Sequence, residues 1–211
     1  MKIRDITLSS KWGTEIRQKL YQLDGESKSL VVLFPGKYFS CDRSPLYYAG
    51  VAARQQGMDV LKLEYGYQVA RVELDLKDLP DVIEECMEAI QAVAEAYNNL
   101  IFVSKSLGTL IAGEIECRIQ MTIHNIYLTP LHATLPYIND AKGMIIYGTQ
   151  DPEFESVSVD AIIPSAERRV IAIEGADHAL ERETVQGSLD VLQFLVTTYT
   201  EFYETVLNRP S

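Results

Sequence analysis

Short runs of apolar and β-branched residues alternate with longer amphipathic stretches along most of this chain, and this alternation limits the folds open to it. Residues 30–34 form one such run, which stops at Pro35-Gly36 and is typical of a strand buried on both faces. Similar runs predict strands at residues 59–63, 100–103, 122–128, 143–147 and 169–173. Because helical patterns lie between them, we expect an α/β protein with a mostly parallel central sheet and helices on both faces. The length of 211 residues fits a single domain over residues 1–211.

Helix signals fill the intervals between the predicted strands. The dipeptide Ser44-Pro45 is suited to begin one helix, with the serine as its cap. Asp81 and Glu84 are spaced as a capping box at the start of another. Apolar residues keep helical spacing from about residue 184 to 207, which predicts a long final helix. Residues 1–23 alternate roughly between apolar and polar side chains, which favours an antiparallel hairpin ahead of the parallel sheet.

The charge balance excludes several classes of partner. Lys and Arg number 19 against 30 Asp and Glu, so the net charge is −11, which argues against nucleic-acid or membrane binding. No apolar run suggests a signal peptide, and we expect a cytoplasmic protein. Its cysteines, Cys41, Cys86 and Cys117, are odd in number and have no metal-ligand spacing, so reduced thiols are expected.

Three polar motifs follow three of the predicted strands. Ser106 is the centre of Ser-Lys-Ser-Leu-Gly between a strand and a helix, where small flanking residues permit a sharp turn. Asp151 follows the next-to-last strand in Gly-Thr-Gln-Asp-Pro, and His178 follows the last strand in Gly-Ala-Asp-His. Because parallel strands build sites at their carboxyl ends, we expect these three side chains to meet at one edge of the sheet.

This set of residue types suits acyl transfer. An imidazole activates a serine hydroxyl, and a carboxylate orients the imidazole and stabilises its charged form. The oxyanion of the intermediate needs backbone N–H donors. We expect one donor from Leu107 and the other from Lys37 or Tyr38, in a loop where Gly36 permits close approach to a substrate. These assignments make Ser106 the nucleophile and leave open which of the two loop residues donates.

The motifs together resemble the α/β-hydrolase superfamily, and within it the small, capless bacterial esterase-like and dienelactone-hydrolase-like members. The resemblance covers roughly residues 29–200. It implies the α/β-hydrolase fold, with His178 as base and Asp151 as acid, and hydrolysis of an ester, thioester or related acyl bond. Two positions depart from the usual pattern: Ser104 replaces a glycine, and Pro35 stands where many members carry histidine.

Other residues compete for these roles. His124 and His132 are the remaining histidines, and the first falls in a predicted strand. The rival carboxylates near the proposed acid are Glu153, Glu155 and Asp177, of which Asp177 is better placed to cap a turn. Lys105 is interpreted as a solvated side chain at the start of a helix rather than as a binding residue. No cluster of metal ligands is visible, and we expect neither a metal nor a cofactor.

The segment 129–142 is too short for a large cap. We expect it to form a loop and short helix, with Pro130, Leu131 and His132 joining Gly36 in contact with the substrate. An open cleft flanked by acidic residues favours short, neutral acyl groups. We therefore predict a serine hydrolase acting on a small-molecule ester or thioester through an acyl-enzyme. The alternatives are a peptidase or amidase of the same fold and a non-catalytic binding protein.

Overall fold

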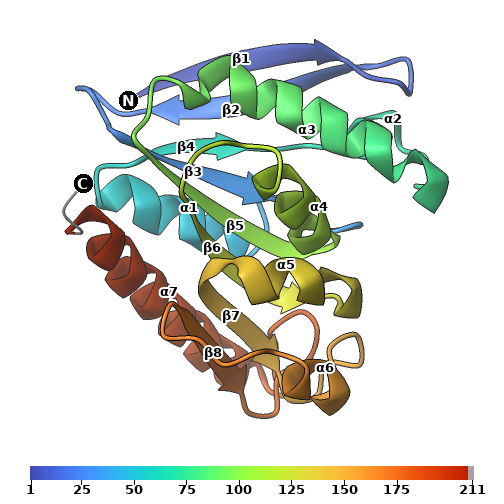
Figure 1. Ribbon diagram of the computed structural model, residues 1–211, viewed down its shortest axis with the longest axis vertical. Helices are drawn as coiled ribbons and strands as arrows, with labels where there is room; N and C mark the ends of the chain where they lie inside the picture. The colour runs from blue at the N-terminus through green and yellow to red at the C-terminus, as the bar shows by residue number, and fades with distance from the viewer. Residues whose placement is uncertain (209–211) are drawn as a thin grey trace.

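One eight-stranded sheet runs through the computed structural model, which describes residues 1–208 (Figure 1). The strand order is β1-β2-β4-β3-β5-β6-β7-β8. Strands β3 to β8 pair in parallel, whereas the hairpin β1–β2 joins β4 in antiparallel fashion. The strands are β1 Lys2–Ser9, β2 Glu15–Gln22, β3 Ser29–Phe34, β4 Asp59–Lys62, β5 Asn99–Ser106, β6 Ile123–Pro130, β7 Lys142–Gly148 and β8 Arg168–Ile173. The predicted hairpin and the mostly parallel sheet are both confirmed.

Helices cover both faces of this sheet. The α-helices are α1 Leu46–Gln55, α2 Gly66–Ala70, α3 Leu79–Ala94, α4 Leu107–Glu116, α5 Leu135–Asp140, α6 Ser156–Asp160 and α7 Val185–Leu207. Two 3₁₀ turns, η1 Leu76–Asp78 and η2 His132–Thr134, precede α3 and α5. Helices α1 and α7 pack on one face, and α3, α4 and α5 on the other (Figure 1).

The buried core explains the continuous apolar run of β3. Every residue of this strand is buried. Leu30, Val32 and Phe34 point into the core beneath α3 and α4. Val31 and Leu33 belong to the second core, beneath α1 and α7. A strand between two helical layers must be apolar on both sides, and this is why the alternation typical of half-exposed strands is missing here.

Two predicted helix caps are wrong. Ser44 makes no capping bond, because it lies inside a turn closed by a hydrogen bond from the N–H of Tyr47 to the carbonyl of Arg43. Helix α1 then begins at Leu46, after the cis Ser44-Pro45 peptide. Asp81 and Glu84 form no capping box, because η1 runs directly into α3 and the helix begins at Leu79. Both acidic residues therefore already lie inside the helix.

Other local features follow the sequence closely. The hydroxyl of Thr184 accepts a hydrogen bond from the N–H of Gly187 and caps α7. All three cysteines are free thiols, with Cys41 and Cys86 buried and Cys117 exposed. Among residues 1–208, no helix combines the length and the apolar character needed to cross a membrane.

Candidate active site

The turn from β5 into α4 presents Ser106 at the carboxyl end of the sheet. Its backbone has φ 52° and ψ −121°, a left-handed conformation that is uncommon for any residue other than glycine. Gly108 makes this turn possible in a crowded place, since a Cβ there would lie 2.5 Å from the carbonyl oxygen of Pro35. Ser104, which replaces the usual glycine, is fully buried in β5 and has no left-handed φ. The strain of the elbow is therefore concentrated at Ser106.

Ser106, His178 and Asp151 form a continuous hydrogen-bonded chain. The Oγ of Ser106 lies 2.9 Å from Nε2 of His178. The Nδ1 of His178 lies 2.9 Å from both carboxylate oxygens of Asp151. The Asp151 side chain is fully buried, and its Oδ1 also accepts a hydrogen bond from the N–H of Glu153. This geometry allows the imidazole to take a proton from the serine hydroxyl while the carboxylate fixes its other nitrogen.

The rival carboxylate nearest His178 in sequence has a different role. The Oδ1 of Asp177 accepts hydrogen bonds from the N–H groups of Ala179 and Glu181, at 2.8 and 3.0 Å. It therefore shapes the loop that carries His178, as its position in the sequence suggested. Glu153 and Glu155 are exposed on the turn after β7, and the hydrogen bonds of the imidazole go to Asp151 and Ser106 instead.

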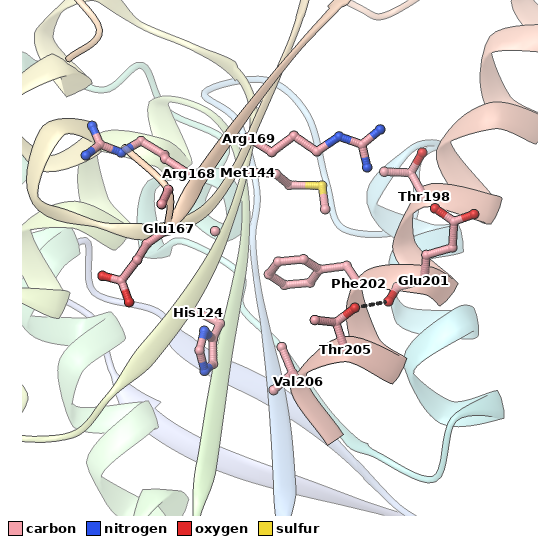
Figure 2. Close-up of a pocket in the computed structure, with 12 residues that line it drawn as sticks. His124, Met144, Glu167, Arg168, Arg169, Thr198, Glu201, Phe202, Thr205 and Val206 are labelled. Carbon is pink, nitrogen blue, oxygen red and sulfur yellow. Dashed lines mark hydrogen bonds between the residues drawn. The ribbon is translucent and has the colours of Figure 1, made fainter. Parts of the chain in front are cut away.

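The other two histidines lie away from Ser106. Nδ1 of His132 hydrogen-bonds to the hydroxyl of Ser158, on α6. His124 lies at the amino-terminal end of β6, away from the carboxyl ends of the strands, and lines a cavity of about 280 Å³ beside α7. Figure 2 shows this cavity, which is separate from the surroundings of Ser106. His124 and Glu167 lie on the side of the sheet and Phe202 on helix α7. Among residues 1–208, no group of three or more His, Cys, Asp or Glu side chains is placed to hold a metal ion.

The loop after β3 is held by three polar side chains whose roles no sequence pattern indicated. The hydroxyl of Tyr65 donates to the carbonyl of Pro35, and the hydroxyl of Tyr67 to that of Lys37. Gln68 donates from Nε2 to the carbonyls of Gly36 and Lys37. These residues carried no recognisable signal, because the short helix α2 has no strong pattern.

These contacts orient the candidate oxyanion donors. In a trans peptide the N–H points away from the carbonyl of the same unit. Because the carbonyls of Gly36 and Lys37 face α2, the N–H groups of Lys37 and Tyr38 point away from it. Neither has a hydrogen-bond acceptor within residues 1–208, whereas the N–H of Gly36 bonds to the carbonyl of Phe39. Leu107, at the first position of α4, likewise has an N–H without a helical partner.

A cleft of about 550 Å³ opens over Ser106 and His178. Gly36 and Leu131 line it, as does Leu76, an exposed leucine that no sequence motif marked. Pro130 and His132, both expected to contact the substrate, do not line the cleft. Strand β6 extends to Pro130 rather than ending near residue 128, so this proline is buried in the sheet and His132 turns toward α6.

Lys105 departs most from its predicted environment. It was expected in solvent, but its side chain is only 1% exposed. Its ammonium group donates to the hydroxyl of Thr129 and to the backbone carbonyl of His178, both at 2.6 Å. Burial lowers the pKa of Lys105 to about 8, although the carboxylates of Asp151, Asp177 and Glu181 oppose this effect.

Comparison with solved structures identifies the fold. A lidless α/β serine hydrolase from Xanthomonas campestris has a TM-score of 0.73 and 13% identity, covering 100% of this chain and 97% of its own. The protein Est1E from Butyrivibrio proteoclasticus has a TM-score of 0.74 and 12% identity, covering 97% and 99%. The α/β-hydrolase domain-containing protein 10 from mouse has a TM-score of 0.69 and 11% identity, covering 98% and 100%.

These structural similarities show that the chain has the α/β-hydrolase fold without a large cap, as its motifs implied. At this level of identity they establish the fold alone. No protein-family model matches the chain, and no curated protein matches it in sequence. The case for an activity therefore rests on the site.

Proposed function

We propose that this chain, which has the α/β-hydrolase fold, is a serine hydrolase that cleaves small carboxylic esters or thioesters through an acyl-enzyme. The observation that carries the proposal is the unbroken chain of 2.9 Å contacts from Ser106 through His178 to Asp151. A structural serine at a helix start would need no such partner. The strained backbone of Ser106 supports the same reading, because strain of this kind clusters at functional sites.

In the proposed reaction, His178 accepts the proton of Ser106 as the hydroxyl oxygen attacks the acyl carbon. Asp151 holds the imidazole and stabilises its positive charge. The N–H of Leu107 and one from Lys37 or Tyr38 would bind the oxyanion of the tetrahedral intermediate. Collapse expels the alcohol or thiol, which takes the proton from His178. Water then attacks the acyl-serine by the same steps in reverse.

The cleft supports small acyl substrates. Its apolar lining includes Leu76, Leu107 and Leu131, and within residues 1–208 no large cap closes over it. Each buried methylene contributes about 0.8 kcal/mol, so an open cleft gives little gain beyond short chains. The exposed charges at the cleft include Lys37 against Glu153 and Asp177, while Lys105 adds a buried positive charge at its base. We therefore infer a preference for short, neutral acyl esters over long-chain lipids.

A fluorophosphonate probe provides the direct test of this proposal. It should label Ser106 in the wild-type protein, and Ser106→Ala should abolish both labelling and ester hydrolysis. Ser104→Ala is the matched control, because this serine lies two residues before Ser106 and is fully buried in β5. Labelling at another serine, or none in folded protein, would refute the mechanism and favour a non-catalytic binding protein.

Substrate panels then identify the leaving group. Hydrolysis of p-nitrophenyl esters from acetate to palmitate should show its highest kcat/KM at the short chains. A maximum at palmitate would contradict the open cleft. Thioester and anilide analogues of the best acyl group separate an esterase or thioesterase from an amidase, since the three differ only in the group expelled.

A further inference from the structure

A buried ammonium group next to the candidate triad contacts two loops and the end of one strand. The Nζ of Lys105 donates to the backbone carbonyl of His178 and to Oγ1 of Thr129, each at 2.6 Å. It also lies 5.1 Å from the centre of the Phe39 ring, a distance typical of a cation–π contact. These partners belong to the loop of the base, the end of β6 and the candidate oxyanion loop. One side chain thus contacts three of the segments that surround the nucleophile.

The end of β6 is shaped to meet this lysine. Lys105 pairs with Leu128 and Ser106 with Pro130, so Thr129 is the extra residue of a β-bulge. Thr129 has φ 42° and is fully buried. A left-handed backbone is a clear outlier for a β-branched residue, and bulges of this kind re-aim side chains beside active sites. Here the bulge accompanies the hydrogen bond between Oγ1 of Thr129 and the ammonium group of Lys105.

Fold stability does not readily account for a lysine at this position. Burying an ammonium group removes it from water, and apolar residues of similar size often stabilise a protein as well or better. The same desolvation lowers the pKa of Lys105 to about 8. Nearby carboxylates of Asp151, Asp177 and Glu181 favour the charged form, so the group remains largely protonated at neutral pH. A charge kept here despite its cost points to a role in the site.

We propose that Lys105 is a positioning residue for His178, fixing the backbone of the base while Asp151 fixes its ring. The proposal rests on the serine hydrolase function proposed above. His178 is 31% exposed through its side chain and comes from a loop after the edge strand β8. The bond to Asp151 orients the imidazole but does not restrain its main chain. The bond from Lys105 to the carbonyl of His178 supplies that second anchor, tying the loop to the strand that carries Ser106.

Replacing the ammonium group by a thioether of similar length tests this role. In Lys105→Met, kcat for a short ester and the rate of fluorophosphonate labelling at Ser106 should fall about 10- to 100-fold, because a displacement near 1 Å has that effect. KM should change by less than about threefold, since the cleft lining is otherwise kept. Amide hydrogen exchange should accelerate in residues 174–181 but not in β6. Lys62→Met is the matched control, removing a largely covered lysine outside the cleft, and should leave all four measurements near wild type.

A second variant separates loss of the charge from loss of packing. Lys105→Ala removes the side chain beyond Cβ, and propylammonium has the shape and charge of the missing part. Added propylammonium should restore part of the labelling rate, whereas propanol should not; labelling is used because amines can attack esters directly. This comparison also holds if the methionine variant folds poorly.

The outcomes distinguish the two proposals. Wild-type kcat and labelling in folded Lys105→Met would overturn the positioning role, as would equal rescue of Lys105→Ala by propanol. A wild-type protein that neither hydrolyses esters nor reacts with the probe would refute the serine hydrolase function itself. In that case hydrogen exchange still tests whether Lys105 restrains the loop of His178. An unchanged exchange rate in residues 174–181 of Lys105→Met would overturn that role.

Discussion

The backbone of Ser106 offers a stability measurement that is independent of any substrate. Its φ of 52° and ψ of −121° lie where L-residues are strained by about 1–3 kcal/mol, whereas glycine is not. Ser106→Gly should release this strain, while Ser106→Ala keeps the Cβ and loses only the hydroxyl. Glycine also raises the entropy of the unfolded chain, which offsets about 0.4–1 kcal/mol. We therefore expect the glycine variant to be more stable than the alanine variant by about 1–2 kcal/mol.

Urea unfolding at 25 °C measures this difference. The single tryptophan, Trp12, packs against Tyr67 and is itself 94 residues before Ser106 in the sequence, so its fluorescence reports unfolding of the chain. With a slope of about 2 kcal/mol/M, the glycine midpoint should lie about 0.5–1 M above that of alanine. Neither variant should hydrolyse esters, because both lack the nucleophile.

The same two substitutions, glycine and alanine, at Ser104 provide the control. This residue sits in β5 without a left-handed φ, so Ser104→Gly should be less stable than Ser104→Ala by about 1 kcal/mol. The sign of the glycine effect should thus reverse between two serines two residues apart. A glycine variant at position 106 that is less stable than alanine by about 0.4–1 kcal/mol, as expected at position 104, would show that the turn is not strained.

Three further substitutions probe the site and the fold. Asp151→Asn should keep the fold by circular dichroism but lower kcat by about 10⁴-fold, because the imidazole of His178 then loses its preferred tautomer. Gly108→Ala should cost about 1–3 kcal/mol in urea unfolding and lower kcat at least tenfold, since the new Cβ would lie 2.5 Å from the carbonyl oxygen of Pro35 and push the oxyanion loop from α4. Burial raises the pKa of Glu116 from 4.5 to about 7. Between these two pH values its carboxyl is therefore protonated in the folded state and ionised in the unfolded state. Wild-type stability should therefore fall by up to about 3 kcal/mol as pH rises from about 4.5 to 7, and urea unfolding of Glu116→Gln should lack that fall.

The sequence predicted the parts of the site that depend on local patterns. Ser106, Asp151 and His178 each follow a strand within a short motif, and the topology of a parallel sheet brings such positions to one edge. The structure places all three within hydrogen-bonding contact. The strands were predictable for the same reason, because buried apolar runs between turn residues are strong local signals.

What the sequence could not show depends on register between distant strands. Lys105 lies in a central strand where a bulge at Thr129 places a hydroxyl beside its ammonium group, and no local pattern marks a bulge on another strand. Pro130 was predicted at the cleft because β6 was expected to end two residues earlier. In both cases pairing across the sheet decided the outcome, and neighbours in sequence gave no indication of it.

The positions of the strands suggest a thermal consequence. The nucleophile extends from β5, which is paired on both sides, whereas the base follows β8, an edge strand paired only with β7. Edge strands open locally at a lower free energy than central ones. We therefore expect warming to separate His178 from Ser106 while the centre of the sheet is still intact. Such a protein would lose turnover reversibly below its melting temperature. The highest temperature at which it is active would be set by the stability of the pairing between β7 and β8.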